Sequence, residues 1–288
     1  ELLRSPNAKE YLAQRKINES VIQEWGIGYA PDIGEALAIR LKKAGLSLSE
    51  CAQAFLVKQD AAGGYMDQFR GRVTFPIHDE RGKLVAFGGR ILGDGIPKYI
   101  NSSDTPIYNK SRVLYGMHLA KEHIAKEEFA VLVEGYLDVI ACHRAGIKNA
   151  VASLGTALTD EQIKLLSRWC PKIVVLYDSD TAGIKAAERA AELIQSHKLT
   201  VRIACVPEGS DPDTLLTKGG PAALLKVVQE SLSLLEFRLA QLNKRLKPND
   251  EEYWSEVTKV LASYENPLEL QKHLLPIAAQ YPGISDRL

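Results

Sequence analysis

Three pairs of acidic residues are the clearest chemical signal in this sequence. Each pair follows a short apolar run: Glu134 with Asp138, Asp178 with Asp180, and Asp211 with Asp213. Grouped carboxylates are costly unless a cation neutralises them, and ligand sets made only of oxygen select hard ions over zinc or copper. We therefore expect a site for Mg²⁺ or Mn²⁺, and with it phosphoryl or nucleotidyl transfer.

The spacing within each pair suggests a role. Residues i and i+2 of an extended segment project to the same side, so each Asp-x-Asp pair can offer two oxygens to one ion. Glu134 ends an apolar run, where it can bind metal or exchange a proton. Asp138 falls in the first turn of the next helix, where it can instead complement the helix dipole. A lone Asp-x-Asp is more often a helix N-cap, but three pairs at one sheet edge favour function.

The segments that must position these acids alternate between strand and helix. Apolar runs predict strands, and capped amphipathic stretches predict helices between them: strands at 130–134, 149–153, 172–178 and 200–206, and helices at 138–144, 159–169 and 181–197. This alternation implies right-handed crossovers and a parallel sheet, whose ligands bind beyond the carboxyl ends of its strands. All three acidic pairs fall at such ends.

The flanking regions follow other patterns. Helices are expected to open at Ser5-Pro6, Asn18 and Ser47, and a period of two from about Phe55 predicts an antiparallel meander over 55–57, 72–78 and 84–87. After about residue 230 the pattern is helical, with a helix start at 248–250 and a break at 266–267. The fold class is therefore α/β, or α+β overall. We expect a mixed α+β subdomain over 1–127, a parallel-sheet domain over 128–228 and a helical bundle over 229–288.

Positive charge gathers between Gly64 and Arg112, although Lys plus Arg equals Asp plus Glu at 36 each over the whole chain. The basic residues of this block are Arg70, Arg72, Arg81, Lys83, Arg90, Lys98, Lys110 and Arg112. Interleaved glycines, as in 70–72 and 88–90, would let the backbone approach a phosphate while guanidinium groups bind its oxygens. Tyr99 and Tyr108 could stack on unpaired bases. Alone, the block would be an ordinary solvated surface, but beside an acidic metal site it fits a polynucleotide groove.

Composition excludes several classes of protein. The chain has 288 residues, of which 25% are charged and 45% hydrophobic, as in soluble globular proteins. Its four cysteines are scattered without a Cys-x-x-Cys, which disfavours a zinc module or a disulfide framework and favours a reducing cytoplasm. No apolar run approaches the roughly 20 residues that span a bilayer. The chain does not begin with Met, and we expect it to be part of a longer protein.

The motifs together resemble a known family. Glu134-Gly-Tyr-Leu-Asp138, Asp178-Ser-Asp-Thr-Ala-Gly183 and Asp211-Pro-Asp213 are similar to the motifs of the Toprim domain, which bacterial primases, topoisomerases and some nucleases share. Upstream, the segments 69–77, 86–90, 97–102 and 113–116 resemble DnaG-type bacterial replicative DNA primases in order and spacing. The resemblance covers nearly the whole chain. Ser103-Asp104 departs from the usual Pro-Glu of the family.

The resemblance implies an RNA polymerase core that makes short RNA primers on single-stranded DNA from ribonucleoside triphosphates. It implies Glu134 as the main catalytic carboxylate and the other acids as metal ligands, with Asp138 the lesser candidate. It assigns Arg90, Lys98 and Lys110 to the nucleotide or nascent primer, adds Tyr99 and Asn101 to the nucleotide-binding set, and puts Arg70 and Arg72 on the template path.

The family also implies partners and a location. A full-length member carries an N-terminal zinc module and a C-terminal domain that binds the replicative helicase, and we expect neither in this chain. We expect a monomer that works in the bacterial cytoplasm at the replication fork, without membrane contact. Two alternatives remain: a Toprim enzyme that cleaves DNA, such as a topoisomerase or nuclease, and a non-catalytic scaffold that binds single-stranded DNA.

Overall fold

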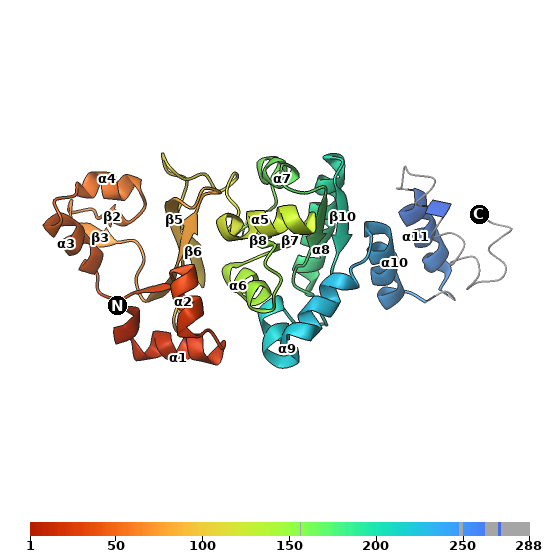
Figure 1. The fold of residues 1–288 in the computed structure, drawn as a ribbon, viewed down its shortest axis with the longest axis horizontal. Coiled ribbons are helices and arrows are strands. Elements are labelled where there is room, and N and C mark those ends of the chain that lie inside the picture. The colour runs from red at the N-terminus through yellow and green to blue at the C-terminus, as the bar shows by residue number, and fades with distance from the viewer. Residues whose placement is uncertain (156, 248–249, 263–269, 272–288) are drawn as a thin grey trace.

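The chain begins with two short helices that cover one side of an antiparallel sheet. The computed structural model describes residues 1–155, 157–247, 250–262 and 270–271, and it arranges the molecule along one long axis (Figure 1). A 3-10 turn (Leu2–Arg4) leads into α1 (Pro6–Gln14) and α2 (Glu19–Trp25). The side chains of Ser5 and Asn18 accept hydrogen bonds from the first-turn amides, which confirms both predicted helix starts.

The antiparallel sheet has four strands in the order β1-β4-β5-β6. These are β1 (Gly28–Ala30), β4 (Arg72–His78), β5 (Leu84–Ile91) and β6 (Tyr99–Asn101). Antiparallel pairing of β4 with β5 confirms the strands predicted at 72–78 and 84–87. The strand predicted at 55–57 does not join this meander, because Val57 pairs with Asp67 in a separate hairpin. Strands β1 and β6 were not revealed by the sequence pattern.

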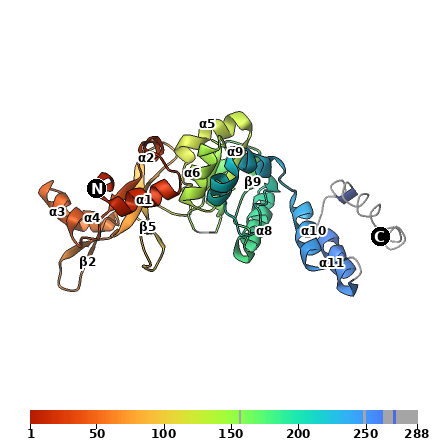
Figure 2. The same cartoon turned by 90° about the horizontal axis from the view of Figure 1, so that it is seen from below.

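A small lobe projects from this sheet at one end of the molecule (Figure 2). It comprises α3 (Ala36–Lys43), α4 (Leu48–Gln53) and the hairpin of β2 (Val57–Gln59) with β3 (Tyr65–Asp67). Helix α4 begins at Ser47, whose side chain accepts from the amide of Glu50. Phe55 was expected to begin a strand, but it has φ +60° in the turn after α4, so pairing starts only at Val57.

The centre of the molecule is a parallel sheet in the order β10-β9-β7-β8. Its strands are β7 (Phe129–Val133), β8 (Ala150–Ala152), β9 (Lys172–Val175) and β10 (Thr200–Ile203). The helices between them are α6 (Tyr136–Arg144), α7 (Asp160–Ser167) and α8 (Thr181–Ser196). The predicted alternation and the parallel sheet are confirmed.

Helices cover both faces of this sheet. One face packs on α6 and α9 (Pro212–Gln229), whose apolar side chains share a core with Val131 and Val133 and with the antiparallel sheet. The other face, which includes Leu132 and Ile173, packs on α5 (Met117–Glu127), α7 and α8. Alternate strand residues therefore enter different cores, which explains why the strands read as continuous apolar runs. The core shared between the two sheets fixes one relative to the other.

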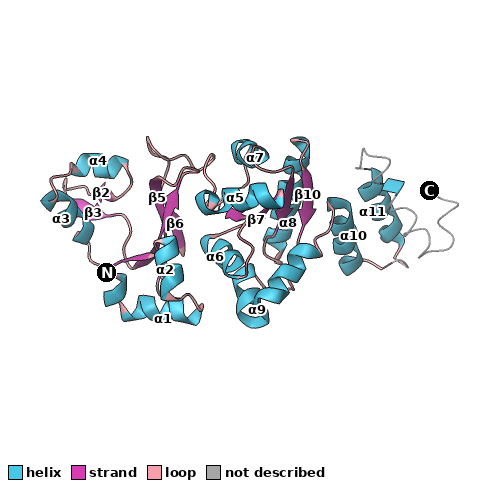
Figure 3. Ribbon diagram, in the orientation of Figure 1, coloured by secondary structure: helices cyan, strands magenta, loops and turns pink. Residues whose placement is uncertain are grey.

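Among the described residues, the elements after β10 are all helices (Figure 3). Helix α10 (Leu234–Arg245) begins with a capping box between Ser233 and Glu236 and packs against α11 (Glu251–Ala262). The predicted helix start at 248–250 falls partly outside the described residues, and the predicted break at 266–267 lies wholly outside them.

The observed architecture confirms the predicted fold class, whereas the subdomain limits stay a prediction. Helix α5, which ends the expected N-terminal subdomain, contributes Met117, Ala120 and Ile124 to the core of the parallel sheet. Within the described part of the chain, no helix combines the length and apolar character needed to cross a membrane.

Candidate active site at the edge of the parallel sheet

The strand order places two of the acidic residues side by side. From β7 the chain crosses to β8 on one side and then returns to β9 on the other side of β7. The carboxyl ends of β7 and β9 thus form the point where the winding direction changes, which is where open α/β sheets bind ligands. Glu134 follows β7 directly and Asp178 follows β9, and the backbone N–H of Asp178 donates to Glu134 Oε1 at 3.0 Å.

Three of the remaining acids cap helices at the same edge. Asp138 Oδ2 accepts from the amide of Gly135 at 3.1 Å, within the first turn of α6. Asp180 accepts from Gly183 as the N-cap of α8, and Asp211 accepts from Thr214 as the N-cap of α9. The capping role that we considered for single acids is therefore present at these positions, together with their grouping at one edge.

The acids raise one another's pKa. Burial, followed by the charges of Asp178, Asp211, Asp213 and Glu134, raises the pKa of Asp138 well above its usual value. Burial and then Glu134 raise the pKa of Asp178 to about 7. Burial also raises the pKa of Asp213, although Arg15 opposes this shift. The protein alone does not compensate this negative charge.

A divalent cation fits this charge pattern. Asp178 Oδ1 is buried without a hydrogen-bond partner, as expected of an oxygen that a cation would bind. In the residues that the structure describes, however, no three His, Cys, Asp or Glu side chains converge as metal ligands. The acids instead bond to backbone amides and Arg15, so metal binding would require some of these side chains to rotate.

Four of the six acids, but not Asp180 or Asp213, line a cavity of about 320 Å³ that both sheets enclose, which we call the acidic cleft. Glu134, Asp138, Asp178 and Asp211 line it from the parallel sheet. Arg15, Lys98, Tyr99 and Asn101, from the N-terminal part of the chain, also line it. Asp180 lies outside this set and lines a neighbouring hollow between the sheet edge and α10, which Asp178 also borders.

Arg15 is a site residue that the sequence pattern did not reveal. It lies at the end of α1, donates to Asp213 Oδ2, and extends into the acidic cleft. The guanidinium groups of Arg15 and Arg90 lie 5.2 Å and 4.1 Å from the ring centroid of Tyr11, which therefore holds both cations by cation–π contact. A single Arg at the end of a short helix has no local signature, because its partner Asp213 is 198 residues away in sequence.

Three expectations about the basic block need correction. Arg72 does not lie on an open template path, because it is buried and its guanidinium donates to the carbonyls of Gly89, Pro97 and Lys98. Tyr108 is 3% exposed, which leaves no ring face for stacking on a base.

The third correction concerns the glycines at 88 and 89. A Cβ on Gly88 would lie 2.0 Å from the hydroxyl of Tyr136, and a Cβ on Gly89 would lie 2.7 Å from the ring of Phe69. These glycines therefore make room for protein side chains, and the space beside them is not available to a phosphate. Arg70, by contrast, lies half-buried in the segment before β4.

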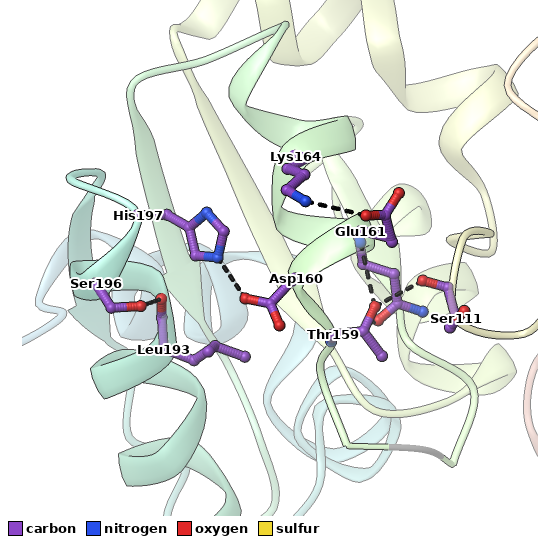
Figure 4. Close-up of polar contacts among 9 residues, drawn as sticks. Ser111, Thr159, Asp160, Glu161, Lys164, Leu193, Ser196 and His197 are labelled. Carbon is purple, nitrogen blue, oxygen red and sulfur yellow. Dashed lines mark hydrogen bonds and ion pairs between the residues drawn. The ribbon is translucent and has the colours of Figure 1, made fainter.

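The segment that contains Lys110 is hydrogen-bonded to the N-terminal end of α7. Thr159 Oγ1 donates to the carbonyl of Ser111 at 2.6 Å (Figure 4). The buried amide of Gln162 donates to the carbonyls of Lys110 and Val113. Thr159 and Gln162 also form the predicted capping box. Lys110 is not among the residues that line the acidic cleft.

Comparison with known proteins identifies the family. Residues 1–121 match the family model described as DNA primase catalytic core, N-terminal domain, and residues 131–216 match a Toprim-like model. A DNA primase of Halalkalibacterium halodurans is 38% identical over 97% of this chain and 48% of its own length, so the chain spans about half of that relative.

Solved structures extend the match to the fold. The RNA polymerase domain of the Mycobacterium tuberculosis primase DnaG, in complex with double-stranded DNA, superposes with a TM-score of 0.87 at 32% identity. That match covers 96% of this chain and 92% of the other. A DnaG primase catalytic domain bound to single-stranded DNA matches with a TM-score of 0.78 at 33% identity, over 94% and 92% of the two chains. The chain belongs to the DNA primase family and is similar throughout to the catalytic core of those proteins.

Proposed function

We propose that this chain is the RNA polymerase core of a bacterial primase, which makes short RNA primers on single-stranded DNA from ribonucleoside triphosphates. One observation supports this most directly: Glu134 and Asp178, at the winding switch of the parallel sheet, line the same cavity as Arg15 and Lys98. Negative groups for a divalent ion and positive groups for a triphosphate thus share one cleft. The similar domains that carry DNA support nucleic acid as the ligand of this surface.

The chemistry would be attack of a 3′-hydroxyl on an α-phosphate, with pyrophosphate leaving. A Toprim-like domain implies use of a divalent metal. We propose Mg²⁺ or Mn²⁺, held by Glu134, Asp178, Asp180, Asp211 and Asp213, with Asp138 as the lesser ligand. A bound ion would neutralise the triphosphate and lower the pKa of the attacking hydroxyl.

The protein's own groups would orient the reactants. Glu134 Oε1 is occupied by the amide of Asp178, which leaves Oε2 to take the proton of the attacking hydroxyl. Lys98 and Arg15, which both line the acidic cleft, would bind phosphate oxygens. Arg90 and Lys110 would bind further along the nucleotide or primer. Tyr99 is 39% exposed and lines the cleft, so its ring is available for base stacking.

Subdomain roles and partners follow from the same proposal. Residues 1–127 would bind template and nucleotide with Arg70 on the template path, residues 128–228 would carry catalysis, and 229–288 would form the helical subdomain. In the full-length protein, a zinc module would precede this core and a helicase-binding domain would follow it. The core would act as a monomer in the bacterial cytoplasm, at the replication fork.

One assay separates the proposal from its alternatives. The protein is incubated with single-stranded DNA, labelled ribonucleotides and Mg²⁺ or Mn²⁺, and the products are resolved by size. New RNA that requires the template supports a primase, cut DNA would indicate a Toprim nuclease or topoisomerase, and neither product would indicate a binding scaffold. Asp178→Ala serves as the control and should abolish RNA synthesis while the fold is retained.

A further inference from the structure

Asn101 joins the two sheets by hydrogen bonds from both ends of its side-chain amide. Its Nδ2 donates to the carbonyl of Leu154 at 2.9 Å, and its Oδ1 accepts from the hydroxyl of Tyr136 at 2.6 Å. A backbone carbonyl can only accept, so the amide orientation is fixed and the hydroxyl of Tyr136 must donate. Asn101 belongs to β6 of the antiparallel sheet, whereas both partners belong to the parallel-sheet side.

The carbonyl that Asn101 holds belongs to a residue in a costly backbone conformation. Leu154 has φ +62° and is 3% exposed, and Gly155, which follows it, has φ +69°. A residue with a Cβ seldom adopts this left-handed conformation unless its surroundings impose it. Leu154 and Gly155 follow β8, whose carboxyl end neighbours that of β7, and they form the wall of the acidic cleft beside Glu134. The side chain of Asn101 therefore supports one wall of the cleft.

Packing fixes Tyr136, the second partner of Asn101. Its ring stacks on Phe75 with centroids 4.8 Å apart and meets Tyr115 edge-on at 4.7 Å. The hydroxyl lies directly over Gly88, where even a methyl group would not fit. Tyr136 is also the first residue of α6, two positions after Glu134. One end of the Asn101 amide is thus tied to the segment that carries Glu134, and the other end to the neighbouring wall of Leu154 and Gly155.

We propose that Asn101 is a positioning residue: by linking Tyr136 to Leu154, its amide sets the separation between the Glu134 segment and the Leu154–Gly155 wall. This role deepens the proposed function and rests on it. It differs from the expectation that Asn101 binds nucleotide, because both ends of the amide are bonded within the protein. A positioning residue should affect turnover, whereas a nucleotide ligand should affect mainly the KM for nucleotide.

Asn101→Asp is the sharpest test, because the two side chains have the same shape. The aspartate still accepts from Tyr136 but cannot donate to Leu154, so it faces that carbonyl with negative charge. We expect kcat for RNA synthesis to fall about tenfold to a hundredfold, with the KM for ribonucleotide and the affinity for single-stranded DNA within about twofold. Hydrogen exchange at the amides of Leu154 and Gly155 should rise. Tyr136→Phe, which keeps the ring, should have the same effects to a smaller degree.

Ser102→Ala is the matched control. Ser102 is the next residue in sequence and is fully buried, but its hydroxyl bonds only to the amide and carbonyl of Phe87, inside the antiparallel sheet. This variant should lower stability without changing kcat or the exchange of Leu154 and Gly155.

Three outcomes would overturn the proposal: unchanged exchange in Asn101→Asp, a higher KM at unchanged kcat, or the same kinetic defect in Ser102→Ala. If the parent protein makes no RNA, the proposed function fails, while the exchange measurements still decide whether Asn101 supports the wall.

Discussion

The side chain of Glu134 accepts a hydrogen bond from the backbone amide of Asp178 across the carboxyl ends of two neighbouring strands, at 3.0 Å. The two residues are 44 positions apart in sequence, and the strand order alone makes them neighbours. This contact holds one oxygen of Glu134 and brings the two carboxyl groups close together. The proposed proton transfer depends on this contact, and the charge of Glu134 adds to the effect of burial in raising the pKa of Asp178.

Glu134→Gln should separate catalysis from binding. The glutamine oxygen can still accept from the amide of Asp178, so the local structure should persist while the charge and the basic group are lost. RNA synthesis should fall by orders of magnitude, and the dissociation constant for single-stranded DNA should stay within about threefold, as for a group that acts in the transition state. Single-turnover synthesis and fluorescence anisotropy measure the two quantities. A variant that mainly loses DNA affinity would place Glu134 outside the reacting centre.

Metal-free stability should fall as pH rises, because of Asp178. Its pKa is raised to about 7 in the folded state, so the folded protein holds this proton more tightly than the unfolded chain, in which Asp titrates near about 4. The stability due to this proton is fully present below pH 4 and is lost as pH rises through 7. After allowance for solvent screening, we expect a loss of about 1–2 kcal/mol in the free energy of unfolding.

Urea unfolding in a chelator at pH 5 and pH 8 tests this dependence. Asp178→Asn, which cannot ionise, should lose less stability between the two pH values than the parent does. Added Mg²⁺ should stabilise the parent at pH 8 more than at pH 5. If the free energy of unfolding depended equally on pH in the parent and the variant, the pKa of Asp178 would not be raised in the folded protein.

Arg70 and Arg72 should behave differently although they are two positions apart. Arg72→Ala removes the charged donor of three backbone carbonyls, of which the bond to Gly89 is buried and those to Pro97 and Lys98 are part-buried, and should lower the free energy of unfolding by about 1.5–3 kcal/mol. Arg70→Ala should change stability by less than about 0.5 kcal/mol but reduce the salt dependence of single-stranded DNA binding by about one unit of slope. Dissociation constants for single-stranded DNA across a salt series test the expected change in slope, and urea unfolding tests the expected changes in stability. An unchanged slope for Arg70→Ala would remove this surface from the template path.

The hydrogen bonds between α7 and the Lys110 segment should affect the KM for ribonucleotide. Thr159→Val removes both the N-cap of α7 and the hydrogen bond to the carbonyl of Ser111 (Figure 4), and it should cost about 1–2 kcal/mol of stability. The KM for ribonucleotide should rise, because the segment that carries Lys110 loses one of its hydrogen bonds to α7.

Ser233→Ala is the control for this experiment, since it removes the equivalent cap from α10. It should cause a similar loss of stability without the change in KM. Equal KM values in the two variants would mean that Lys110 needs no support from α7 or does not contact the nucleotide.

Much of the architecture could be predicted from local patterns. The alternating apolar runs indicated the parallel sheet, because strands buried on both faces must be continuously apolar. Ser5, Asn18 and the Thr159–Gln162 pair marked helix starts because capping involves residues that are close in sequence. The six acids could be found because each follows a strand and the ends of parallel strands share one edge. The family resemblance supplied the activity that the local patterns did not specify.

The tertiary structure decided which of these residues meet and which are used for packing. Arg15 is hydrogen-bonded to Asp213, which lies 198 positions away in sequence, and Arg72 to the carbonyl of Pro97, 25 positions away. Neither contact can be recognised from the residues that neighbour each arginine in sequence. Gly88 appeared suited to a phosphate, but the side chain that occupies its space belongs to Tyr136, the first residue of α6. Local sequence patterns record the period and the ends of elements. The neighbours of a side chain in the cleft depend on strand order and on the packing of one sheet against the other, which only the folded chain sets.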